Sequence, residues 1–152
     1  MFLSARAQES FGGLMFSARL DTAQQVGSLA VPSSGNGIAG FSYHDDTLWF
    51  NITANGLTGP ILTAHIHTTA GDGVEYSLLP FIDGNTIKGY LPAIKFKEGE
   101  LKPFLDGQFY VNIHTSANPN GEISGRIMPE ADINYQAVLD MAQAGHTNPK
   151  GK

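Results

Sequence analysis

Strict alternation of apolar and polar residues is the feature that most constrains the fold of this chain. In a β-strand successive side chains point to opposite faces, so alternation marks a strand with one buried face. Residues 48–53 are a clear case, with an apolar face and a second face that carries Trp49, Asn51 and Thr53. Eight segments with this character are predicted to be strands: 16–21, 39–43, 48–53, 61–68, 75–82, 86–94, 109–115 and 122–128.

Asn-Gly and Asp-Gly pairs punctuate these segments. Such pairs accept the positive φ angles that tight hairpin turns require. Short strands at this spacing, separated by glycine-rich turns, are typical of an all-β sandwich or barrel. Six pairs occur, at 36–37, 55–56, 72–73, 83–84, 106–107 and 120–121.

The two ends of the chain differ from the segment between them. We expect residues 14–129 to form the β domain, and residues 1–13 to be an N-terminal extension or an extra edge strand. Residues 131–144 have apolar side chains near helical spacing, and Gly145 offers a helix stop. Residues 130–152 are therefore interpreted as a short C-terminal helix that packs on the β domain, or as a linker tail.

Composition and charge exclude several classes of function. The net charge of −5, with only 9 Lys and Arg in 152 residues, argues against nucleic-acid binding, which needs a basic surface. The absence of Cys removes disulfides and thiol catalysis. No apolar run approaches the ~18 residues of a membrane span.

Histidines provide the candidate chemistry. His65 and His67 are two residues apart in a predicted strand, so both imidazoles project from the same face. His114 shares the polar face of its own predicted strand with Tyr110 and Asn112. Imidazole suits copper, zinc, iron and nickel, so convergence of His65, His67 and His114 would create an open metal site, with copper or zinc as the candidate ions. A hydrogen-bonded polar cluster without metal is the alternative.

Other polar residues near this cluster have supporting or structural interpretations. Glu122, like Tyr110 and Asn112, is a candidate supporting residue because a carboxylate can orient a metal-binding imidazole. A structural role, either capping a turn or pairing with Arg126, is the favoured interpretation of Glu122. His44 is expected to be a solvated turn residue, and no role is expected for His146 in the tail.

Several blocks, taken in this order and spacing, resemble the chordin domain (CHRD) family over about residues 14–129. The two most specific are the His-Ile-His block and the Tyr-Val-Asn-Ile-His-Thr block with its following Pro-x-Gly-Glu-Ile segment. The blocks are residues 16–20, 48–53, 56–60, 63–67, 110–115 and 118–127.

The resemblance implies a fold and a location. It implies a Greek-key, immunoglobulin-like or dismutase-like antiparallel β-sandwich of about eight strands. It also implies a bacterial-type secreted or surface protein that is extracellular, periplasmic or at the cell surface, with its signal peptide absent from this sequence. The His-Ile-His block is similar to copper ligands of copper–zinc superoxide dismutase, but the bridging His and the Cys pair of that enzyme have no match here.

Two functions are expected from these observations. The first is a non-catalytic extracellular module for protein binding or self-assembly, with a homo-oligomer as one outcome and a His-based metal site as an open feature. The second is a mono-copper or zinc protein with redox or hydrolytic activity at His65, His67 and His114. The first is favoured, because the sequence shows no catalytic constellation around the histidines.

Overall fold

The computed structural model describes residues 13–23, 32–69, 75–92, 99 and 101–130. The predicted N-terminal extension and C-terminal helix lie outside these residues, apart from Gly13 and Glu130. Within the described residues, neither helix has the length and apolar content needed to cross a membrane.

The described chain is built almost entirely of strands, as the alternation predicts. The strands are β1 (Leu14–Asp21), β2 (Asn36–His44), β3 (Thr47–Asn55), β4 (Ile61–Thr68), β5 (Glu75–Ser77), β6 (Ile82–Asp83), β7 (Thr86–Leu91), β8 (Phe109–Thr115), β9 (Ile123–Arg126) and β10 (Met128–Pro129). The same described residues contain two short helices, the 3₁₀ helix η1 (Leu79–Phe81) and the α-helix α2 (Leu101–Leu105).

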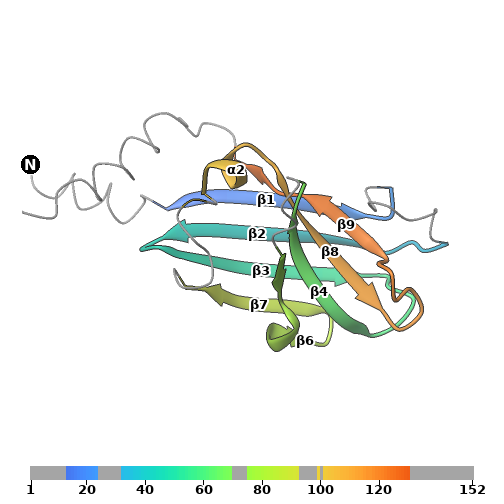
Figure 1. Ribbon diagram of the computed structural model, residues 1–152. Coiled ribbons are helices and arrows are strands. Elements are labelled where there is room, and N and C mark those ends of the chain that lie inside the picture. The colour runs from blue at the N-terminus through green and yellow to red at the C-terminus, as the bar shows by residue number, and fades with distance from the viewer. Residues whose placement is uncertain (1–12, 24–31, 70–74, 93–98, 100, 131–152) are drawn as a thin grey trace, which may run out of the picture.

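One antiparallel sheet, curled on itself, forms both layers of the sandwich. Its strand order is β5-β4-β8-β9-β1-β2-β3-β7-β6, with β10 also paired to β1. Figure 1 shows β4 and β8 running diagonally across β1, β2, β3 and β7, with β9 leading from one layer to the other. The predicted antiparallel β-sandwich is therefore confirmed.

The core lies between the inward faces of the two layers. Alternate residues of β3 are buried, among them Leu48, Phe50 and Ile52. Helix α2 adds Phe104, whose ring packs edge-on against Phe16 with a centroid separation of 4.6 Å. The apolar residues of the alternating pattern thus form the contact between the layers, which is the main source of stability in such a fold.

The described residues contain ten strands rather than the expected eight. The segment predicted as one strand over residues 75–82 is broken into β5, η1 and β6, because Pro80 cannot donate to a sheet ladder and its fixed φ suits the start of a helical turn. β10 is a second addition, and it pairs with β1 at Phe16 and Ser17. Helix α2 was not indicated by the sequence pattern.

The turns follow glycine only in part. Gly56, Gly84, Gly107 and Gly121 have positive φ, as their Asn-Gly or Asp-Gly pairs predict. The pair at 36–37 is instead the start of β2, and the pair at 72–73 lies outside the described residues.

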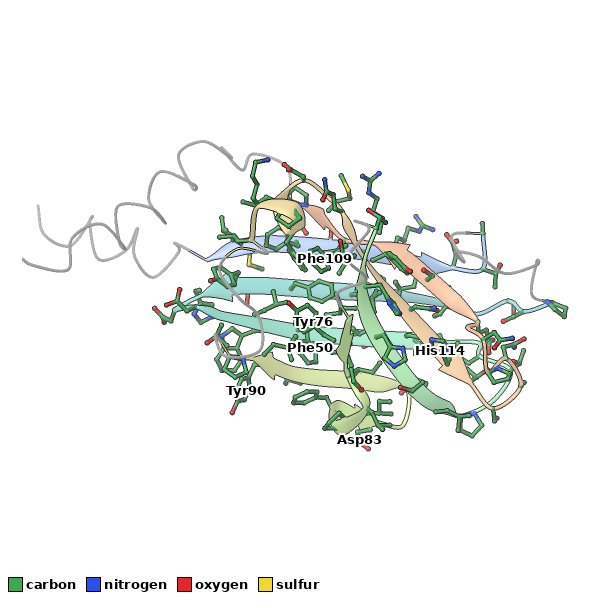
Figure 2. The ribbon with its side chains drawn as sticks, viewed as in Figure 1. Phe50, Tyr76, Asp83, Tyr90, Phe109 and His114 are labelled. Carbon is green, nitrogen blue, oxygen red and sulfur yellow. The ribbon has the colours of Figure 1, made fainter. Side chains whose placement is uncertain are left out.

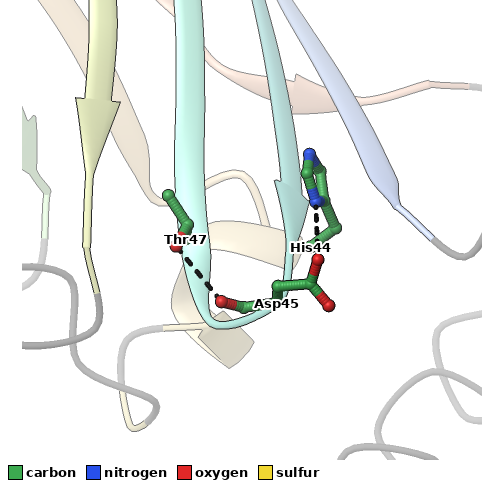
Figure 3. A network of polar contacts seen from close by, with 3 residues as sticks. All are labelled: His44, Asp45 and Thr47. Atoms are coloured by element: carbon green, nitrogen blue, oxygen red, sulfur yellow. Dashed lines mark hydrogen bonds and ion pairs between the residues drawn. The ribbon is translucent and has the colours of Figure 1, made fainter.

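The turn between β2 and β3 consists of Asp45 and Asp46, so it has no glycine. Both residues have positive φ, of 50° and 56°. Figure 3 shows that the Thr47 hydroxyl donates to the Asp45 carbonyl at 3.1 Å and that His44 Nδ1 lies 3.4 Å from the Asp45 carboxylate. These local contacts hold a two-residue turn in a conformation that residues with a Cβ adopt reluctantly.

Replacing Asp46 with glycine should therefore stabilise the protein. Asp46→Gly removes the Cβ from a left-handed position, where glycine is favoured by up to about 1 kcal/mol. It also removes a long contact of 3.4 Å from the Tyr43 hydroxyl, which is weak. We expect the free energy of unfolding in urea to rise by about 0.5 kcal/mol or more. An unchanged or lower midpoint would show that the turn is not strained.

Candidate functional site

β4 and β8 bring the predicted site residues to one outer face. The buried Ala64 and Ile66 alternate with His65 and His67 along β4, so the histidines face away from the core. The β4–β8 register pairs His65 with Asn112 and His67 with Tyr110. The face that the sequence predicted for His65, His67, Tyr110, Asn112 and His114 is therefore present.

The three histidines form a row on this face, with His65 in the middle. The ring centroid of His65 lies 5.3 Å from that of His67 and 5.1 Å from that of His114. His114 is paired across the ladder with Thr63, two residues before His65, whereas His67 is two residues after it. His67 and His114 therefore approach His65 from opposite sides.

This row does not support the predicted convergence of three imidazoles on one ion. Among the described residues, no group of three or more His, Cys, Asp or Glu side chains is arranged to hold a metal. The physical reason is the register, because a single ion must lie about 2 Å from each ligand nitrogen. Metal binding at these histidines stays a prediction.

The supporting residues have distinct surroundings. The His67 ring stacks on Tyr110, with centroids 5.2 Å apart and an interplanar angle of 19°. His114 Nδ1 lies 2.8 Å from the carbonyl oxygen of Pro119, to which it donates a hydrogen bond. Asn112 lies between Tyr110 and His114 along β8 and is buried, with only 7% of its surface exposed.

Glu122 is a buried structural centre rather than a partner of a histidine. Its carboxylate accepts a hydrogen bond from the Ser33 hydroxyl, two from the backbone N–H and hydroxyl of Thr58 at 2.9 and 2.8 Å, and one from the Thr115 hydroxyl at 2.6 Å. A longer bond of 3.3 Å comes from the Asn118 amide. Ser33, Thr58 and Asn118 belong to three separate loops and Thr115 ends β8, so one carboxylate holds the three loops together at the end of that strand.

The hydrogen bonds to Glu122 determine its ionisation. Burial alone would raise its pKa, but the hydrogen bonds from Ser33, Thr115 and Thr58 outweigh burial and lower the pKa to about 2. Glu122 is therefore ionised at neutral pH with its charge shared among donors. These contacts are those of a residue with a structural role, and the partners are Ser33, Thr58, Thr115 and Asn118 in place of Arg126.

A groove of about 410 Å³ lies on the outer face of the opposite layer. Its floor passes over Gly40, where an added Cβ would meet only the Asn51 carbonyl oxygen at 3.9 Å. Met15 and Trp49 line its apolar part and Lys88 a polar part. Because Gly40 has no side chain, the outer surface of the sheet is hollow at this position.

Exposed aromatic rings continue from this groove in a row. Trp49 stacks on His44, with centroids 5.7 Å apart and an interplanar angle of 8°. Tyr90 follows on β7, with its ring centroid 4.9 Å from that of Trp49. Trp49 is 41% exposed, Tyr90 49% and Met15 51%, which is unusual for a contiguous apolar group. Figure 2 shows Tyr90 and His114 in separate parts of the molecule.

The sequence analysis did not predict this surface, although the alternating pattern contains an indication of it. Trp49 and Tyr90 occupy the polar positions of their alternating segments, where a solvated side chain is expected. His44 is exposed, as predicted, but it is the last residue of β2 rather than part of the turn, and it extends the aromatic row. His146 lies outside the described residues.

Comparison with known proteins gives one match. The model of the CHRD domain family matches residues 16–127, which is more than half of the chain and includes the histidine face and every groove residue except Met15. No curated protein matches the chain. No solved structure matches it either.

Proposed function

The chain belongs to the CHRD family, and on that premise we propose that it is a non-catalytic extracellular β-sandwich module that binds a protein partner through the groove on β1, β2, β3 and β7. The proposal includes secretion or surface display of a bacterial type, which the resemblance to extracellular family members supports. It also includes self-assembly as one form of partner binding.

The observation that carries the proposal is the row of exposed rings beside the groove. Large aromatic side chains are enriched at binding surfaces, because a rigid ring provides much contact area at a low entropic cost. Across the ladder, Met15 is paired with Ser42, Ser42 with Trp49, and Trp49 with Tyr90, so four strands contribute to one continuous strip. A strip of this width fits an extended peptide segment better than a single small group.

The face is a better binding surface than the edges of the sheet. The strand path ends on β5, with three residues, and on β6, with two. Short terminal strands offer few unpaired backbone groups, which is how sheets avoid edge-to-edge pairing. Side chains on the face therefore supply most of the contact in the proposed complex.

Trp49 makes the proposal directly testable, because it is the only tryptophan in the chain. Peptides of 12 residues selected from a display library against the wild-type protein should shift Trp49 emission to shorter wavelength as they cover the ring. Trp49→Ala should weaken their binding by about 2 kcal/mol, or roughly thirtyfold in Kd, as for a central aromatic contact. Gly40→Val should weaken it similarly by filling the groove.

Ile38→Ala is the matched control. Ile38 is an apolar residue on the same face of β2, 71% exposed, and it does not line the groove. This variant should bind the peptides with the wild-type Kd. The proposal is wrong if the selected peptides leave Trp49 emission unchanged and bind Trp49→Ala and Gly40→Val as tightly as the wild type. Light scattering on the same variants reports whether a second copy occupies the groove.

Redox or hydrolytic activity of a copper or zinc centre remains the alternative function. It would depend on His65, His67 and His114, on the layer opposite the groove. No geometric observation favours turnover over binding, so activity at these residues stays a prediction rather than the proposed function.

A further inference from the structure

Three buried polar atoms on the outer face of β8 and β9 have no hydrogen-bond partner in the described structure. They are His114 Nε2, Asn112 Oδ1 and Ser124 Oγ. Asn112 is paired with His65 on one side and with Ser124 on the other, and His114 is two residues along β8. Asn112 is 7% exposed and Ser124 is fully buried. Buried polar atoms are nearly always satisfied, so such a cluster is expected to contact a water molecule or an ion.

The hydrogen bond at His114 Nδ1 determines whether His114 Nε2 can act as a metal ligand. A carbonyl oxygen can only accept, so His114 Nδ1, at 2.8 Å from Pro119 O, carries the proton. In the neutral ring Nε2 then presents a lone pair. A backbone carbonyl that fixes the tautomer in this way is the usual outer contact of a histidine that binds a metal.

His65 is placed to share an ion with His114. Its Nε2 lies 3.3 Å from the hydroxyl of Thr63, the residue paired with His114 across the ladder. Two imidazoles that bind one tetrahedral ion at 2.0–2.1 Å would have ring centroids about 5.2 Å apart, with each nitrogen about 1.15 Å from its ring centre. The observed separation is 5.1 Å, with the rings inclined at 71°. The His65–His67 separation of 5.3 Å fits as well, so the choice of His114 rests on its buried Nε2 beside Asn112 Oδ1.

We propose that His65, His114 and the amide oxygen of Asn112 bind one divalent first-row transition-metal ion. Two imidazole nitrogens and one neutral oxygen favour Cu²⁺ and Zn²⁺ over Mg²⁺ or Ca²⁺, which prefer oxygen ligands. Water completes the coordination. His67 is not a ligand in this site, because it approaches His65 from the other side and stacks on Tyr110. The site is independent of the groove and of the function proposed for it.

Calorimetric titration of the full chain with CuCl₂ or ZnCl₂ alone tests this site. We expect one ion per chain, with a Kd on the order of micromolar for Cu²⁺ and weaker binding of Zn²⁺. His65→Ala and His114→Ala should each raise the Kd about tenfold or more. His67→Ala is the matched control from the same face, and its Kd should stay within about threefold of the wild type.

A buried water molecule would satisfy the same three atoms as a metal ion. A variant that binds Cu²⁺ more tightly distinguishes the two occupants. Asn112→Asp replaces the amide with a carboxylate of nearly the same shape and should tighten Cu²⁺ binding about tenfold. Electron paramagnetic resonance of the wild-type Cu²⁺ complex should show coupling to two imidazole nitrogens, a readout that does not depend on whether any variant folds. The proposal is overturned if the wild type binds neither ion, if Asn112→Asp brings no gain, or if His67→Ala abolishes binding.

Discussion

Gly125→Ala is expected to destabilise the protein by at least about 3 kcal/mol, an effect at the upper end for a single substitution. Gly125 lies in β9, the strand through which the sheet passes from one layer of the sandwich to the other. An alanine Cβ at this position would lie 2.1 Å from the carbonyl oxygen of Arg19 and 2.7 Å from Cδ2 of Leu20. Real Cβ atoms do not approach other atoms so closely, so one strand must move.

The obstacle at Gly125 is backbone, which is why the cost is large. A flexible side chain could rotate away, but the Arg19 carbonyl belongs to β1, which is held by pairing to β2 over its whole length from Leu14 to Asp21. β9 is tied to β8 in turn through four residue pairs. Separating β9 from β1 therefore opens the junction at which the sheet curls, and it exposes buried residues such as Leu20 and Ile123.

Gly40→Ala is the matched control for this prediction. Gly40 is also a sheet glycine, but its Cβ would meet nothing nearer than 3.9 Å. Its free energy of unfolding should change by less than about 0.5 kcal/mol, or increase, because alanine has less freedom in the unfolded chain. Urea denaturation followed by circular dichroism measures both variants. Equal stability of Gly125→Ala and the wild type would show that β9 and β1 are not in close contact.

The sequence predicted strands well where their two faces differ. β1, β3 and β4 have mainly apolar side chains on one face and mainly polar side chains on the other, with Met15 and Trp49 as exceptions, so burial against the second layer decides their structure. The alternating pattern is typical of a sandwich or a barrel, and the family resemblance favoured the sandwich. Helix α2 was not predicted, because five residues are too few to show a helical period and its apolar residues are ordered by contacts such as Phe104 with Phe16.

The candidate site was predicted only as far as its face. Alternation places His65, His67 and His114 on outer faces, but it does not define which residue of β8 lies beside which residue of β4. The register pairs His114 with Thr63 and so separates it from His67. Register depends on contacts between strands far apart in the sequence, and a shift of two residues would have kept every side chain on the same face while changing all its neighbours.

The sequence pattern also could not predict the hydrogen-bond partners of Glu122. Ser33 and Thr58 are 89 and 64 residues from Glu122, and only the folded chain brings them to its carboxylate. A glutamate after an Asn-Gly turn is ordinarily exposed, so its complete burial carries information that the local sequence does not.

Glu122→Gln should destabilise the protein by about 3 kcal/mol at pH 7. This figure is the free energy that corresponds to lowering the Glu122 pKa from 4.5 in an unfolded chain to about 2 in the folded protein. Glutamine keeps the shape but replaces one acceptor oxygen with an N–H donor, which would face the hydroxyl of Thr58 or Thr115. The charge that these donors stabilise is lost as well.

The pH dependence of stability identifies the ionised carboxylate as the cause. Because the folded pKa lies below the unfolded value, Glu122 stabilises the protein fully above about pH 4.5, and this contribution is lost as the pH falls toward 2. The difference in unfolding free energy between the wild type and Glu122→Gln should therefore be largest near neutral pH and shrink across this window. Glu130→Gln, at an exposed carboxylate, is the control and should have the unfolding free energy of the wild type at pH 7. A difference that stays constant between pH 7 and pH 2 would mean that the shape of the side chain, and not its charge, holds the three loops together.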